Sequence, residues 1–86
     1  MSTWWITSTT MKYIAGEIEG LNTLIMFPNY HDHREMSQTL HMKATSAGFV
    51  SGLGSGDVCC YGRSVSLELE SKLEDTEKLQ RIIRGY

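Results

Sequence analysis

The chain has 86 residues, of which 41% are hydrophobic and 21% charged, and its formal net charge is -2. This length predicts a single domain, residues 1–86, whose small core leaves little room for a large cofactor. The eight Lys and Arg are dispersed without a basic stripe, so we expect no nucleic-acid binding, and the longest apolar run, residues 24–27, is too short for a membrane span. Two Cys and the lack of a signal-like N-terminus predict a cytoplasmic location.

Residues 3–9 are rich in aromatic and β-branched types, a composition typical of a strand. Side chains alternate between the two faces of a strand, so Trp4 and Trp5 would point in opposite directions. One Trp would then lie in the core. The other would be partly exposed and could anchor an interface, unless a helix covers it.

Residues 10–27 support two interpretations. Apolar residues recur at helical spacing, and Thr10 could cap a helix over residues 10–20 that Gly20 ends. Gly16 and Gly20 disfavour one long helix, and Pro28 disfavours helix at the residue before it. We therefore expect a short helix at 10–20 followed by a strand at 22–27. The main alternative is a β-hairpin across the whole region.

A second helix is predicted from His33 to about His41. Asp32 followed three residues later by Glu35 forms the pattern of a capping box. Met36 and Leu40 would form the buried stripe of this helix.

Three strands are predicted next, at residues 47–53, 58–61 and 64–70. A Gly-rich turn at 54–57 separates the first two, and Gly62 with Arg63 has the composition of a two-residue hairpin link. Residues 64–70 alternate apolar and polar side chains without a break, as a half-buried strand does.

The last predicted helix covers residues 72–84. Ser71 and Glu74 form a capping box, acids cluster at its start and bases at its end, and Gly85 can end it. Its sheet-facing side chains would be apolar: Leu73, Leu79, Ile82 and Ile83.

These elements predict an α+β fold built as a two-layer sandwich. Its antiparallel sheet would combine the C-terminal three-stranded meander with one or two N-terminal strands. The helices at 33–41 and 72–84 would pack on one face of that sheet.

The residues with most chemical potential are Tyr30, His31, Asp32 and His33, which we consider as a ligand-binding loop. His31 and His33 could bind a metal together with His41, Cys59 or Cys60. However, neighbouring Cys on a strand point apart, and His33 and His41 lie about 12 Å apart along a helix. We therefore assign no metal and no cofactor.

Catalysis is also not indicated. A Cys59 or Cys60 nucleophile with a His31 or His33 base is conceivable, but such pairs are common in chains of this size. Gly52, Gly54 and Gly56 lack the following helix and the Lys-Ser/Thr pair that a phosphate-binding loop needs. We therefore expect no enzyme.

The sequence favours a small non-enzymatic protein-binding module of inhibitor or accessory type, such as phages and mobile elements encode. Its partner is a protein whose identity the sequence does not give, or a second copy in a homodimer. The residues we expect to bind this partner are Trp4, Trp5, Glu68 and Glu70. The alternative is a small-ligand or metal-binding domain that uses the loop from Tyr30 to His33.

Overall fold

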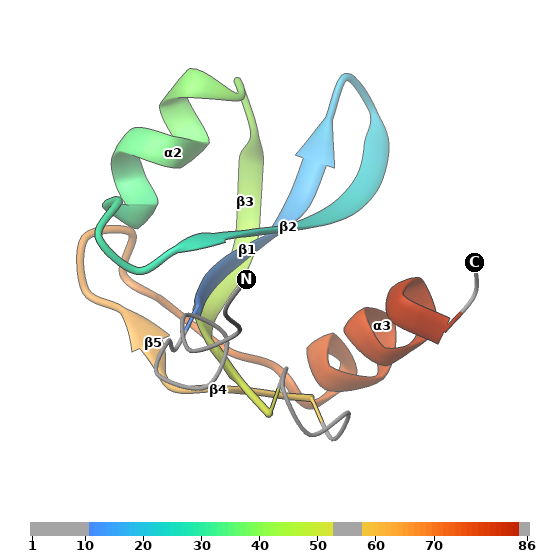
Figure 1. Ribbon diagram of the computed structural model, residues 1–86. Helices are drawn as coiled ribbons and strands as arrows, with labels where there is room; N and C mark the ends of the chain where they lie inside the picture. Colours follow the sequence, from blue (N-terminus) through green and yellow to red (C-terminus); the bar gives the residue numbers. More distant parts are fainter. Residues whose placement is uncertain (1–10, 53–57, 85–86) are drawn as a thin grey trace, which may run out of the picture.

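A computed structural model describes residues 11–52 and 58–84 of the chain (Figure 1). Six strands and two helices occur in this part of the chain. In chain order they are β1 (Met11–Ile18), β2 (Leu21–Pro28), α2 (His33–Thr39), β3 (Lys43–Ser51), β4 (Cys59–Tyr61), β5 (Arg63–Ser64), β6 (Leu69–Glu70) and α3 (Leu73–Arg84). The predicted α+β class is confirmed.

The strands form a four-stranded antiparallel sheet of order β2-β1-β3-β4 and a separate two-stranded sheet of β5 and β6. β1 and β3 are therefore central, while β2 and β4 are the edges. Neither helix in the described part of the chain has the length and apolar character needed to cross a membrane.

The helix predicted at residues 10–20 is wrong, and the alternative hairpin is confirmed. β1 pairs with β2 along its whole length, and Glu19 and Gly20 form the turn with φ of 51° and 82°. Positive φ at both turn residues is the geometry of a two-residue hairpin turn. Tyr13, Ile14 and Ala15 are all fully buried, so β1 is covered on both faces and lacks the alternation that would have identified it as a strand.

The two faces of the sheet carry separate apolar clusters. On one face Leu79 of α3 packs with a cluster that includes Tyr13 and Val50. On the other face Met36 of α2 and Leu40, the C-cap of that helix, pack against a cluster that includes Ile14. The helices therefore lie on opposite faces of the sheet, as Figure 1 shows, and the expectation that both pack on one face is wrong.

α2 begins where the sequence predicted, with Asp32 as its N-cap. The Asp32 carboxylate accepts hydrogen bonds from the amides of Arg34 (3.0 Å) and Glu35 (3.2 Å). The helix ends at Thr39, because His41 adopts a left-handed φ of 53° and its amide bonds back to the Gln38 carbonyl. The predicted end was therefore two residues late.

The strand predicted at 64–70 is wrong, and so is the third strand of the meander. The chain is extended only at β5 and β6, and β5 pairs with β6 instead of with β4. Between them the Glu68 amide bonds to the Val65 carbonyl, and Glu68 has a left-handed φ of 57°. The Ser64 hydroxyl also accepts from the Leu67 amide. A Ser side chain that captures a nearby amide favours a turn over an extended strand.

α3 confirms a C-terminal helix but not its predicted cap. The carboxylate that reaches back over the first turn belongs to Asp75, which accepts from the Lys72 amide at 3.0 Å. Leu79 is buried as expected. Leu73, by contrast, is 97% exposed, and Ile82 and Ile83 are also exposed near the helix end. The expected apolar face is therefore only partly used.

The remaining boundaries differ less. β3 begins at Lys43, earlier than the predicted residue 47, and β2 matches the strand predicted at 22–27. The predicted strand at 3–9, with Trp4 and Trp5, and the predicted turn at 54–57 lie outside the described residues.

A buried hydrogen bond joins the centre of the sheet to the start of α3. The Tyr13 hydroxyl donates to Oδ2 of Asp75 at 2.5 Å, and both side chains are buried. Burial and the neighbouring Asp75 carboxylate raise the pKa of Tyr13 far above its ordinary value of about 10. Tyr13 therefore remains a neutral donor at every physiological pH.

Replacing Tyr13 by Phe should lower the free energy of unfolding by about 1–3 kcal/mol, because the buried Asp75 carboxylate loses a donor. Urea denaturation followed by far-ultraviolet circular dichroism measures this change. The control is Tyr30→Phe, which removes a hydroxyl from an exposed ring and should change stability by less than about 0.5 kcal/mol. Equal unfolding midpoints for the two variants would contradict the structural role of the bond.

Candidate functional site: an open cleft beside α2

An open cleft of about 640 Å³ lies between the start of α2 and the segment that leads from β4 into β5. It gathers residues that are far apart in the sequence. They are Lys12, Asp32, His33, Phe49, Tyr61, Gly62, Arg63, Ser64, Val65 and Ser66. The cleft is larger than the hollow of about 300 Å³ around Glu68 and Glu70. It includes Asp32 and His33, two of the predicted ligand-binding residues.

Aromatic rings form one wall of the cleft. Phe49 and Tyr61 are direct partners across β3 and β4, and their ring centroids are 5.9 Å apart. Tyr61 remains partly exposed, and Val65 beside it is 80% exposed. The cleft therefore offers apolar surface to a ligand without any rearrangement of the sheet.

His33 is a buried structural residue. Its Nε2 lies 2.8 Å from the Gly48 carbonyl oxygen, and because a carbonyl only accepts, Nε2 carries the hydrogen. Its ring meets Phe27 and Phe49 edge-on at centroid distances of 5.6 and 5.7 Å. Burial is the main cause that lowers the pKa of His33, so the imidazole is neutral at pH 7.

Asp32 is committed to the start of α2. The Glu35 amide is the largest cause that lowers the pKa of its carboxyl, with smaller contributions from Ser66, Arg34 and the charge of Lys12. Asp32 is therefore ionised at neutral pH, and its Oδ2 already accepts two backbone hydrogen bonds.

Two cations border the cleft. The Lys12 ammonium donates to the His31 carbonyl oxygen at 2.8 Å, which holds it near the cleft mouth. Arg63 is exposed in β5. Across residues 11–52 and 58–84, one pair of oppositely charged side chains lies within 4.0 Å, Arg81 with Glu77 on α3. Neither Lys12 nor Arg63 therefore forms an ion pair with another described residue.

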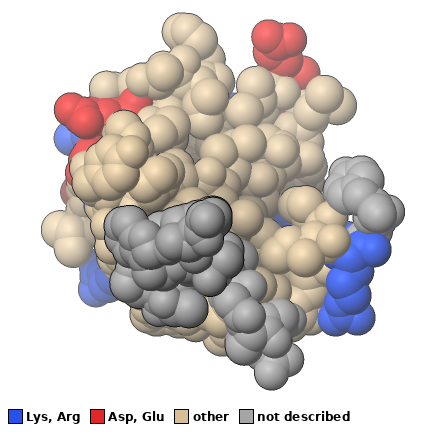
Figure 2. Space-filling view, in the orientation of Figure 1, with Lys and Arg blue, Asp and Glu red and all other residues tan. Residues whose placement is uncertain are grey.

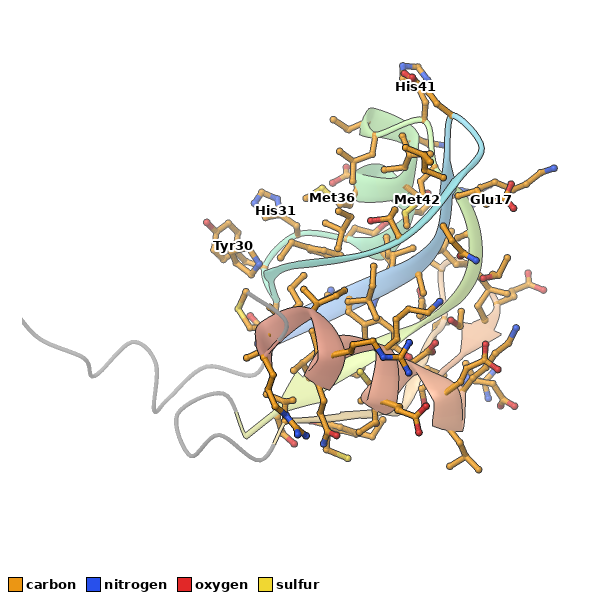
Figure 3. All side chains as sticks on the ribbon, turned by 90° about the vertical axis from the view of Figure 1, so that its right-hand side faces the viewer. Glu17, Tyr30, His31, Met36, His41 and Met42 are labelled. Carbon is orange, nitrogen blue, oxygen red and sulfur yellow. The ribbon has the colours of Figure 1, made fainter. Side chains whose placement is uncertain are left out.

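Tyr30 and His31 lie outside the cleft, at the end of β2. Their rings contact each other with centroids 4.4 Å apart, and Tyr30 is 80% exposed. Figure 3 shows the two side chains together at one side of the molecule, with His41 apart from them at the top of the view. The structure thus separates the four residues of the predicted loop into a pair outside the cleft, the exposed Tyr30 and the half-buried His31, and two structural residues.

The residues considered for metal binding do not converge in the described part of the chain, where three or more His, Cys, Asp or Glu nowhere form a ligand cluster. Cys59 is exposed and Cys60 is buried on β4. Burial, the largest cause, raises the pKa of Cys60 to about 11. Cys60 is therefore a protonated thiol at neutral pH, which is a poor nucleophile and a poor metal ligand.

Glu68 and Glu70, predicted to bind a partner, are exposed around a second hollow of about 300 Å³. Arg63 and Lys72 line the same hollow, so this surface is of mixed charge. Asp75, another member of the acidic run in the sequence, is buried beneath Tyr13. The acids therefore do not form one continuous patch.

Sequence reasoning did not identify Lys12, Phe49, Tyr61 or Arg63 as site residues. They come from β1, β3, β4 and β5. The register of the main sheet pairs Lys12 with Phe49 and Phe49 with Tyr61, and Arg63 follows Tyr61 after Gly62. The helix-capping pattern at Asp32 was the one local sequence signal for the cleft. It identified the border at the start of α2 and gave no information on the border formed by residues 61–66.

Comparison with family models found no matching family, and neither the curated proteins nor the solved structures that were searched include a match. The function must therefore be argued from the chain's own geometry.

The neutral, buried His33 predicts a pH dependence of stability. The imidazole pKa is lower in the folded chain than in the unfolded chain, where it is about 6.5. As the pH falls below 6.5, the unfolded chain takes up a proton that the folded chain refuses, so the free energy of unfolding decreases. Denaturant unfolding between pH 7.5 and about 5 should show this loss.

His33→Gln should flatten that pH dependence, because Gln does not titrate and its side-chain amide can still donate to Gly48. His41→Gln, at an exposed position, should leave it unchanged. The pKa of the Asp32 carboxyl is also lowered in the folded chain. It affects the free energy of unfolding only below the carboxyl pKa of the unfolded chain, about 3.9, which is outside the tested pH range. An identical slope in the wild type and His33→Gln would contradict the prediction.

Proposed function

We propose that the chain is a non-enzymatic protein-binding module whose cleft holds an extended segment of a partner that carries acidic and apolar side chains. The observation that carries this proposal is the combination of two cations, Lys12 and Arg63, that form no ion pair with another described residue, with the exposed apolar surface of Tyr61 and Val65.

The charge of the cleft supports an acidic partner. Among the described residues that line the cleft, His33 is neutral and the one carboxylate, that of Asp32, already accepts from two backbone amides. Lys12 and Arg63 therefore leave the cleft with a net positive charge, although the chain as a whole carries -2. Complementary charge around an apolar contact speeds association and selects the partner.

The apolar residues support a polypeptide ligand. Tyr and Arg are enriched among the residues that contribute most of the binding energy in protein interfaces. The cleft exposes one of each, Tyr61 and Arg63, separated by Gly62. The cleft is also open and borders sheet and loop residues over a broad surface, whereas small-molecule sites bury most of their ligand. A cytoplasmic regulator of inhibitor or accessory type, encoded by a phage or mobile element, is the setting we propose for such a small module.

The alternative, a small-ligand site, draws its support from Asp32 and His33, which line the same cleft. Both side chains have structural bonds that a ligand would have to replace. Trp4 and Trp5, also proposed as partner-binding residues, lie outside the described residues. Glu68 and Glu70 border the neighbouring hollow, where their charge would attract a basic side chain of the partner outside its acidic segment.

The test uses ¹⁵N-labelled protein titrated with an alternating Glu-Leu peptide, with a Lys-Leu peptide as the opposite-charge probe. The amide resonances that shift should cluster at Lys12, Tyr61, Arg63 and Val65, and only the Glu-Leu peptide should produce them. Arg63→Glu should weaken binding at least about tenfold, because the charge that attracts the peptide is reversed.

The matched control is Arg84→Glu, which makes the same charge change on α3, outside the cleft. It should change the affinity by less than about twofold. Shifts that fall elsewhere, or equal binding of both peptides, would refute the proposed cleft. Displacement of the peptide by a small dicarboxylate such as succinate at lower concentration would favour the small-ligand alternative.

A further inference from the structure

The two edges of the main sheet differ in how their backbone groups are covered. At the β4 edge, the Thr76 hydroxyl accepts from the Cys60 amide at 2.9 Å, and the Gln80 side chain donates to the Val58 carbonyl at 3.2 Å. α3 thus supplies side-chain partners to the outward-facing backbone of this edge. Covering an edge with a helix is a common way to prevent strand addition.

The β2 edge lacks this protection among the described residues. β2 is eight residues long, contains no charged side chain, and has its single Pro at the last position. Among the described elements it packs extensively only on β1. Proteins usually protect such edges with Lys, Pro, a bulge or a covering element.

The hairpin geometry identifies which backbone groups of β2 face outward. The turn has two residues, so Ile18 and Leu21 form a hydrogen-bonded pair, and the pairs along the hairpin alternate from there. The amides and carbonyls of Asn22, Leu24 and Met26 therefore point away from β1, at the open edge.

We propose that the β2 edge pairs with the β2 edge of a second copy of this chain, antiparallel and with Leu24 opposite the partner's Leu24. Asn22 then lies opposite the partner's Met26, and every outward amide of these residues meets a carbonyl. The two four-stranded sheets join into one continuous sheet around a two-fold axis.

The exposed side chains at the two ends of β2 favour a second copy as the occupant. Leu21 is 73% exposed at one end, and Tyr30 is 80% exposed just beyond the other. In the proposed register Leu21 of each copy lies opposite the partner's Phe27, at the end of β2 that leads to Tyr30, so the partner strand covers the exposed Leu21. In Figure 3, Tyr30 and Glu17, which pairs with Asn22, lie at opposite ends of the hairpin.

Charge is also compatible with self-pairing. β2 places no like charges opposite each other because it carries none. Figures 1 and 2 share one view, in which β2 crosses the middle of the face and the charged side chains outside the grey region lie at its rim. No residue of β2 lines the cleft, so this proposal does not depend on the proposed function.

Sedimentation equilibrium and concentration-dependent hydrogen exchange test the dimer. The wild-type chain should show a reversible shift from 9.7 kDa to twice that mass as its concentration rises. In the same range, exchange should slow at the amides of Asn22, Leu24 and Met26. A chain that remains monomeric up to about 1 mM, or a dimer in which these amides stay unprotected, would refute the proposal.

Asn22→Pro removes an outward donor without removing a bond to β1, and it should raise the dimer dissociation constant at least about tenfold. Asn22→Ala keeps the amide and should change that constant by less than about threefold. Leu21→Lys places a charge on the edge at an exposed position and should also prevent dimerisation while the monomer stays folded by circular dichroism. Dimerisation unaffected by both Asn22→Pro and Leu21→Lys would refute the β2 interface.

Discussion

The buried bond between the Tyr13 hydroxyl and the Asp75 carboxylate connects the two halves of the molecule. Tyr13 lies in β1, a central strand of the four-stranded sheet, and Asp75 lies in the first turn of α3. The same carboxylate oxygen accepts from the Lys72 amide, so one buried charge fixes both the helix start and its position on the sheet. From that point α3 places Leu79 in the core and Thr76 and Gln80 against the backbone at the β4 edge. A buried carboxylate is costly without donors, so the structure depends on this arrangement being complete.

The opposite face of the sheet is organised by His33 instead of by a charge. Its imidazole bonds to the Gly48 carbonyl between two aromatic rings, and a Cβ at Gly48 would collide with the Tyr61 carbonyl. On this face α2 packs on β1 and β3, and Leu67 and Leu69 of the β5–β6 segment pack against the same apolar cluster. The cleft is lined by the start of α2 and by the chain from Tyr61 to Ser66, and its aromatic wall is the continuation of the packing around His33. The cleft and the core thus share residues. The His33 ring packs edge-on against Phe49, which forms part of the aromatic wall of the cleft.

The sequence predicted those elements whose determinants are local. The Asp32 cap, the strand that ends at Pro28 and the charge distribution of α3 depend on neighbouring residues, and each was placed within a few positions. β1 was misassigned because burial on both faces removes the period of two, and the chance spacing of Met11, Ile14 and Ile18 imitates a helix. Residues 64–70 have the opposite problem, since a perfect alternation is overridden by the Ser64 hydroxyl and the left-handed Glu68. The cleft could not be predicted, because Lys12, Phe49 and Tyr61 meet only through the register of β1, β3 and β4.

The unequal treatment of the two sheet edges gives the proposed surfaces a common consequence. α3 supplies partners to the β4 edge and keeps it from recruiting another strand, so association through the sheet is directed to β2. A two-fold dimer formed at β2 would carry two clefts. In each copy β1 would separate the β3–β4 side of the sheet, where the cleft lies, from the β2 strand at the dimer axis. A partner with two suitable segments would then bind the second cleft at a high effective concentration, which raises overall affinity without any new contact. A chain too small to bury a large interface in one site would in this way gain affinity by doubling a modest one.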